Sequence, residues 1–471
     1  MSTIQDFAER VTGFLEDFML KQQELFSKEE LKYTDLMQDA VTFSQQLSLD
    51  MVQYIMERFD EAAQSAVKKE RTHYVQAHRE RRLVTSLGEL TFTRTYFKER
   101  DTDHYEYLLD NLLQIQPYQR IDEGCAQEIM NHVVDMSYAK AARLATPIQL
   151  SRQSVLNLLK RLKTVPNAPA ERWETVPREM VPARLFIEAD EDHVAMQDGK
   201  NTMVRLIYTY EGKMSCNRTR RQLVGKHAFT SLGSGKKLWE DIDNYLRKRY
   251  GADVYPQVTI IGDGAAWIKN GCEVIPNAEF AIDFFHYNKY MKKIIGNKEG
   301  RGLRQAIKEN DRHHFNKEVR LLLKQAREHD ESRVNSIQTG VTYIRNHWDA
   351  IRLTLLDPEV HSSTEAHVSH MLSTRLSSRP MGWSRRGAET IAKLRIFREN
   401  GGQIKDLYTW ATKENRVSPQ VKTAIVKKTF DKKNQFYISY GAASVHRIPG
   451  SERGIGKGFR FIKNGGFEKI M

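Results

Sequence analysis

The chain has 471 residues, which is enough for several domains that each bury a hydrophobic core. Its 73 lysines and arginines against 60 aspartates and glutamates give a net charge of +13, which favours a polyanionic partner, although a merely basic protein would have the same composition. The three cysteines are scattered and no leader is visible, which argues against a secreted protein. No apolar run is long enough to span a bilayer, which argues against a membrane protein, so we expect a cytoplasmic one.

The N-terminal part of the chain divides into two regions. In residues 1–80, apolar positions recur at spacings of three and four between charged residues, which predicts helices that pack together or self-associate. Residues 81–121 begin with alternating threonines and aromatics around Gly88, which predicts a small β-hairpin region.

Residues 122–165 are predicted to form short helices, the last of which begins after a capping Ser151. Two short helices joined by a tight turn are typical of a helix-turn-helix, although a generic helix pair fits equally well. In a helix-turn-helix, the second helix would bring its polar residues to DNA, and these are Arg152, Ser154, Lys160 and Arg161. The prolines of residues 166–182 then predict a linker.

From residue 183 the pattern changes from helices to strands. Two β-rich runs joined by Asp198-Gly199 come first, and strands alternating with helices follow. This order is typical of an α/β, RNase H-like fold, which we place at residues 183–410 with a helical insertion at about 301–356. Residues 411–471 are basic and would either contact DNA phosphates or form a disordered end.

Three acids occur where a metal-dependent nuclease or transposase would place catalytic carboxylates. Asp190 and Asp263 end strand-like runs, and Glu365 stands among hydroxyls and histidines. Each has an ordinary alternative: a solvated strand end, a turn, or an acid in the first turn of a helix. Together they favour a site for Mg²⁺, with Mn²⁺ as the alternative, that would activate the attacking oxygen and stabilise the leaving oxygen in phosphoryl transfer.

Further candidates lie near these acids. Asp283 at a strand end and His286 three residues on would support a neighbouring metal ligand, unless His286 is an ordinary core histidine. Beyond Glu365, three cationic or ionisable side chains would contact phosphates: His370, Arg375 and Arg379. Trp383 would stack on an unpaired base or, alternatively, pack in the core.

Four segments carry a resemblance to a known family: GDGAAWI at residues 262–268, DFFH at 283–286, EAHVSH at 365–370 and RLSSRPMGWS at 375–384. They closely resemble the ISLre-type insertion-sequence transposases, a group long described as an uncharacterised protein family. This resemblance implies a relation to Mutator-type DDE transposases, with an RNase H-like core and a helical insertion before the catalytic glutamate.

The resemblance also implies roles for individual residues. Asp190, Asp263 and Glu365 match the catalytic, metal-binding triad, and Asp283 with His286 matches an accessory position. The family has a glycine after its first acid, whereas Glu191 follows Asp190 here. Asp192 and Glu188 are therefore alternatives for the first acid.

The implied function is metal-dependent DNA strand cleavage and strand transfer. The expected partners are the terminal inverted repeats of an insertion sequence and target DNA, bound by a homodimer or a larger assembly, without a membrane. Two alternatives remain: a structure-selective nuclease that cuts without joining, and a DNA-binding regulator whose acidic site has decayed.

Overall fold

The computed structural model describes most of the chain: residues 4–162, 164–215, 221–252, 256–296, 299–360, 368–379 and 381–407. The described residues divide into two compact units, one with residues 4–53, 81–92 and 116–407 and the other with residues 54–80 and 93–115. The predicted basic C-terminal region at 411–471 lies outside the described residues. Within the described ranges, no helix is long and apolar enough to cross a membrane.

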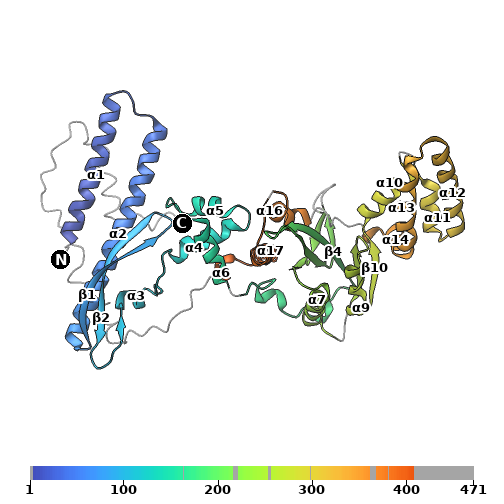
Figure 1. Ribbon diagram of the computed structural model, residues 1–471. Coiled ribbons are helices and arrows are strands. Elements are labelled where there is room, and N and C mark those ends of the chain that lie inside the picture. Colours follow the sequence, from blue (N-terminus) through green and yellow to red (C-terminus); the bar gives the residue numbers. More distant parts are fainter. Residues whose placement is uncertain are drawn as a thin grey trace. The chain divides into compact units, whose positions relative to one another are not determined.

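The chain begins with two long helices, α1 (Ile4–Ser27) and α2 (Tyr33–Glu70), which are drawn in blue in Figure 1. The ring centroids of Phe18 and Phe43 lie 5.1 Å apart, so the helices run antiparallel. The sequence predicts helix up to about residue 80, and this boundary is wrong. Arg71 adopts a positive φ of 54°, which ends α2, and the chain then continues as a strand.

A three-stranded sheet in the order β1-β2-β3 follows, with the bounds His73–Val84, Glu89–Glu99 and Tyr105–Glu106. The β1–β2 hairpin turns at Gly88, the residue around which the sequence predicts the turn. Phe97 of β2 is fully buried and packs with the alanines of α2 and with Leu108 of the short helix α3 (Leu108–Leu112).

Helices α4 (Glu123–Val133), α5 (Tyr138–Ala145) and α6 (Arg152–Arg161) come next. The side chain of Ser151 caps α6 by accepting a hydrogen bond from the backbone N–H of Ser154 at 3.0 Å. The predicted helix pair is thus present, and α4 packs against both of its members.

Residues 122–165 belong to the same compact unit as the central sheet. Val155 and Leu159 of α6 are buried in the same hydrophobic core as Val194 of the central sheet and Leu394 of the later helix α17 (Arg385–Glu399). The predicted linker at 166–182 contains two short 3-10 helices, η1 (Ala170–Trp173) and η2 (Arg178–Met180), and it too belongs to this compact unit.

The central sheet has five strands in the order β10-β9-β4-β5-β8. Strands β4, β5 and β8 are antiparallel neighbours, whereas β9 and β10 run parallel to β4. The bounds are Arg184–Ala195 (β4), Asn201–Tyr210 (β5), His227–Ser231 (β8), Gln257–Gly262 (β9) and Ala278–Ile282 (β10). A separate two-stranded sheet contains β6 (Gly212–Ser215) and β7 (Arg221–Val224).

Helices cover both faces of the central sheet, as the alternation of β4 requires. Leu185 and Ile187 point to the face covered by α7 (Gly235–Tyr250), while Phe186 and Val194 belong to the core that α4, α5, α6 and α17 complete. Two short helices, α8 and α9, connect β9 to β10, and their bounds are Ala266–Lys269 and Gly271–Val274.

A group of helices with its own hydrophobic core follows β10 and packs against it through α14. Figure 1 shows this group in yellow and orange. It consists of α10 (Phe284–Ile295), α11 (Arg301–Lys308), α12 (Arg312–His329), α13 (Ser332–Asn346) and α14 (Trp348–Leu356). Helices α11 to α14 occupy the residues at which the sequence predicts a helical insertion.

The remaining described elements return to the face of the central sheet that α4, α5 and α6 cover. They are η3 (Pro358–Val360), η4 (Ser369–Ser373), α16 (Thr374–Leu376), α17 (Arg385–Glu399) and α18 (Ile404–Leu407).

Candidate active site

Three aspartates lie on neighbouring strands, where the parallel part of the central sheet ends. β4 pairs with β9 as far as Glu188 opposite Ile261. Asp190 lies two residues further along β4, and Asp263 comes directly after the last residue of β9. Asp263 and Asp283 are the first residues after β9 and β10. The last residues of these two strands, Gly262 and Ile282, are paired with each other in the sheet. The sheet therefore brings three carboxylates from distant parts of the sequence to one edge.

Asp283 is buried, with 5% of its surface exposed, and it caps the N-terminus of α10. Its Oδ1 accepts a hydrogen bond from the backbone N–H of His286 at 2.8 Å, and its Oδ2 lies 2.8 Å from Nδ1 of the same residue. Burial lowers the pKa of His286, but the hydrogen bond to Asp283 and the charges of Asp283 and Asp263 outweigh burial, so the pKa is raised. The pair thus favours a protonated histidine beside the aspartates.

The environment of the Asp190 carboxyl group is unfavourable for ionisation. Burial raises its pKa to about 6, and the negative charges of Asp263 and Asp283 add to this rise. A hydrogen bond from the backbone N–H of Glu191 and the charge of His286 act in the opposite direction. Asp190 therefore shares one electrostatic environment with the other two aspartates and the histidine.

This environment predicts a pH-dependent gain in stability for Asp190→Asn. The unfolded chain ionises Asp190 near pH 4 and the folded chain near pH 6, so folding stability is lost as the pH rises between these values. We expect the substitution to raise the free energy of unfolding of the metal-free protein by about 1–3 kcal/mol at pH 7 and to have little effect at pH 4. Urea unfolding at the two pH values measures this, and an equal gain at both would contradict the raised pKa.

Residues of the helical insertion support the loop that carries Asp263. The hydroxyl of Tyr343 in α13 donates a hydrogen bond to the backbone carbonyl of Asp263 at 2.6 Å. Gly264 has a φ of +96°, and a Cβ there would lie 2.7 Å from the ring of His347, so only glycine fits this turn. Tyr343 and His347 were not among the residues predicted for the site, because nothing in the sequence around them distinguishes them from other helix residues.

The structure separates Asp190 from the two alternatives for the first acid. Glu188 is fully buried and accepts hydrogen bonds from the hydroxyls of Tyr208 and Tyr210. Asp192 accepts hydrogen bonds from the hydroxyl of Ser377, with both oxygens at 2.9 Å. Glu188 is thus held in the protein interior and Asp192 is half-buried against Ser377, whereas the charges of Asp263 and Asp283 act on Asp190.

Glu365, the predicted third member of the triad, lies outside the described residues. Among the residues that the structure describes, no group of three or more histidines, cysteines, aspartates or glutamates has the arrangement of a metal site. The donor set of Asp190 and Asp263 nevertheless fits Mg²⁺, which prefers carboxylate oxygens. A divalent cation would also offset the repulsion that raises the pKa of Asp190.

Most of the residues predicted to contact DNA have accessible side chains. Arg152, Lys160, Arg161 and the later residues His370 and Arg379 are exposed. Ser154 is half-buried at the start of α6, where its hydroxyl lies 2.9 Å from that of Ser151. These residues remain predicted DNA contacts.

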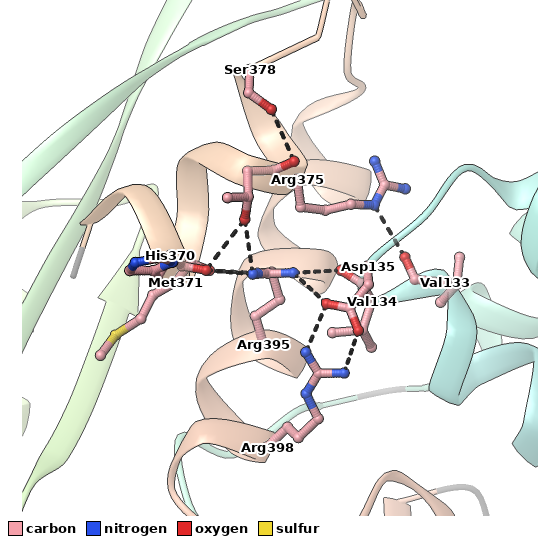
Figure 2. Close-up of polar contacts among 10 residues, drawn as sticks. Val133, Val134, Asp135, His370, Met371, Arg375, Ser378, Arg395 and Arg398 are labelled. Carbon is pink, nitrogen blue, oxygen red and sulfur yellow. Dashed lines mark hydrogen bonds and ion pairs between the residues drawn. The ribbon is translucent and has the colours of Figure 1, made fainter. Parts of the chain in front are cut away.

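The predictions for Arg375 and Trp383 are corrected by the structure. Arg375 is 4% exposed, and its Nε donates a hydrogen bond to the carbonyl of Val133 at 3.2 Å, as Figure 2 shows. Trp383 is 7% exposed and donates its indole N–H to the carbonyl of Leu376 at 2.9 Å. The guanidinium of Arg375 lies over the ring of Trp383, 4.6 Å from its centroid. Both side chains are therefore parts of the core and not surfaces for phosphates or bases.

A second buried arginine joins α17 to the end of α4. Arg395 is 9% exposed, and Nη1 donates hydrogen bonds to the carbonyl of Val134 at 2.9 Å and to Asp135 at 2.7 Å. The same guanidinium also donates hydrogen bonds to the backbone carbonyls of His370 and Met371. The Arg395 side chain therefore lies between η4 and the end of α4, as Figure 2 shows. Its sequence context gave no sign of this role.

These observations define the class of the molecule as a mixed α/β protein with an acidic site at the carboxyl end of its parallel strands. A profile of the uncharacterised protein family UPF0236 matches residues 26–414, and the chain belongs to this family. A UPF0236 protein of Caldanaerobacter subterraneus subsp. tengcongensis is 33% identical over 394 residues, which cover 82% of each chain. The UPF0236 protein in vanSb 3'region of Streptococcus gallolyticus is 25% identical over 343 residues, 68% of this chain and 73% of the relative.

A comparison with solved structures matched the Drosophila P element transposase strand transfer complex. The match has 12% sequence identity and covers 66% of this chain and 92% of the other. Its TM-score of 0.22 is too low to assign a shared fold.

Proposed function

We propose that the protein is a DDE transposase that cleaves the DNA strands of an insertion sequence and joins them to a target in an Mg²⁺-dependent reaction. The observation that carries this proposal is that Asp190, Asp263 and Asp283 gather where the parallel pairing of β4, β9 and β10 ends. Carboxylates gathered in this way repel one another, and a divalent cation is the partner that best stabilises them.

The topology of the central sheet supports an RNase H-like catalytic core. Three antiparallel strands come first in the sequence, and two strands parallel to the first of them extend the sheet on its other side. The helical group α11 to α14 stands between the last strand and Glu365, where the family resemblance places an insertion.

In this proposal Asp190, Asp263 and Glu365 are the catalytic residues and would hold Mg²⁺, with Mn²⁺ as the alternative. When bound, the ions would activate the attacking oxygen and stabilise the leaving oxygen. Asp283 holds His286 in one orientation and favours its protonation, which reduces the repulsion among the carboxylates. The first attack, by water, frees a 3′ hydroxyl at the element end, and this hydroxyl then attacks target DNA.

The proposed partners are the terminal inverted repeats and target DNA, held by a homodimer or larger assembly in the cytoplasm. Contacts with DNA phosphates are supported by the net charge of +13 and by four exposed basic side chains: Arg152, Lys160, Arg161 and Arg379. The name of one relative joins eleven locus designations of a single strain. Many copies in one genome are what repeated insertion of a mobile element produces, and this supports transposition.

A strand-transfer assay tests the proposal. Purified full-length protein is incubated with Mg²⁺, a labelled duplex that contains the DNA flanking its own coding region, and an unlabelled target plasmid. We expect nicks at the element ends, labelled products joined to the plasmid, and neither product when EDTA replaces Mg²⁺. Cleavage without joining would indicate a structure-selective nuclease instead, and specific binding without cleavage would indicate a DNA-binding regulator.

A further inference from the structure

The α1–α2 hairpin leaves large apolar side chains in solvent along both of its helices. The helices are held together by the Phe18–Phe43 contact and by a 2.8 Å hydrogen bond from Gln22 to Asp39. Elsewhere on the hairpin, nine apolar side chains between residues 15 and 52 are 42–75% exposed: Leu15, Met19, Leu20, Phe26, Tyr33, Met37, Val41, Met51 and Val52.

These exposed side chains are not compensated by a core inside the hairpin. Gln22 is the one buried side chain among the described residues 5–53, and none of these residues belongs to the hydrophobic clusters of the described structure. Helices in water obtain most of their stability from burying an apolar face rather than from their intrinsic propensity. The hairpin therefore presents an apolar surface that needs a partner.

The charge of the hairpin argues against nucleic acid as that partner. Residues 4–53 contain ten aspartates and glutamates against four lysines and arginines, a net charge of −6 in a chain whose total is +13. An acidic surface of this kind repels phosphates. The occupant must instead supply apolar side chains, and a second copy of the hairpin supplies the same row of methionines, leucines and aromatics.

We propose that two copies of this chain associate through their α1–α2 hairpins to form a four-helix bundle. Each copy would present the same surface to the other, as a twofold interface requires. α1 has 24 residues and is about 36 Å long, and two adjacent helices are about 20 Å wide, which gives a face of roughly 700 Å² for each copy. An interface of standard size buries about 600–1,000 Å² on each partner, so the area of the hairpin face lies within this range.

Two double substitutions on α2 test this surface. Met37→Glu with Val41→Glu adds two negative charges on the apolar stripe, where the side chains are 48% and 52% exposed. Gln38→Glu with Thr42→Glu adds the same charges at the same spacing one residue further on, at positions that are also exposed and are rotated about 100° around the helix. Because all four positions are exposed, neither variant should lose helix content, and circular dichroism checks this.

The readout is the mass of the full chain in solution, measured by light scattering at micromolar concentration without DNA. We expect two chains for the wild type and for Gln38→Glu/Thr42→Glu, and one chain for Met37→Glu/Val41→Glu, whose dissociation constant should rise at least about 100-fold because charges would be buried in an apolar interface. A single-chain mass for the wild type, or two chains for Met37→Glu/Val41→Glu, would overturn the proposal. So would loss of the dimer in both variants. The measurement needs no catalytic activity, so it is independent of the transposase proposal.

Discussion

Asp263→Asn is expected to abolish DNA strand cleavage while binding to the element ends persists. The substitution keeps the size of the side chain but removes a charged oxygen that would bind Mg²⁺ in the proposed site, directly after β9. Metal-held charge stabilisation contributes several kcal/mol to phosphoryl transfer, so its loss should reduce the cleavage rate by about 10³-fold or more. Gel-shift and cleavage assays on the same labelled duplex separate binding from chemistry.

Asp192→Asn is the matched control, because it makes the same chemical change on the neighbouring stretch of β4. Asp192 accepts hydrogen bonds from Ser377, which an asparagine oxygen can still accept in part, and we expect cleavage to be largely retained. Asp190→Asn should behave like Asp263→Asn. If Asp192→Asn abolished cleavage and Asp190→Asn did not, Asp192 would be the first acid of the triad.

The strand ends of the site could be predicted from the sequence because local patterns define them. The apolar run before Asp263 predicts a buried strand, and a carboxylate directly after such a run indicates a candidate site residue. Only the sheet pairing brings Asp190 near Asp263, and this pairing is not local. The hydrogen bond from Tyr343 to the backbone carbonyl of Asp263 joins residues 80 positions apart, and the sequence of α13 does not predict it.

Exposure was the quantity that the sequence predicted least well. Arg375 and Arg379 look alike in the sequence as phosphate ligands, but Arg375 is buried against Trp383 and Arg379 is exposed. The difference arises because Arg375 reaches the carbonyl of Val133, which is 242 positions away and belongs to a different helix. A cationic residue type predicts an affinity for oxygen acceptors, and whether these are phosphates or carbonyls depends on the fold.

Arg395→Met should be the most destabilising single substitution among the arginines of Figure 2. Methionine fills a similar volume but leaves the carbonyls of Val134, His370 and Met371 without the donor that now reaches them. Removing one partner from a buried, hydrogen-bonded charge network costs about 3–5 kcal/mol, because the groups left behind stay desolvated. Urea unfolding followed by circular dichroism measures the loss.

Arg398→Met provides the comparison, because Arg398 contacts the same Asp135 through hydrogen bonds of 2.6 and 2.7 Å. Its side chain is 43% exposed, so water can replace these bonds and the expected loss is at most about 1 kcal/mol. Equal losses for the two variants would show that the interaction with Asp135, and not the contacts to η4, carries the stability. Since η4 begins four residues after Glu365 in the sequence, a larger loss for Arg395→Met would show that buried hydrogen bonds anchor this segment to α4.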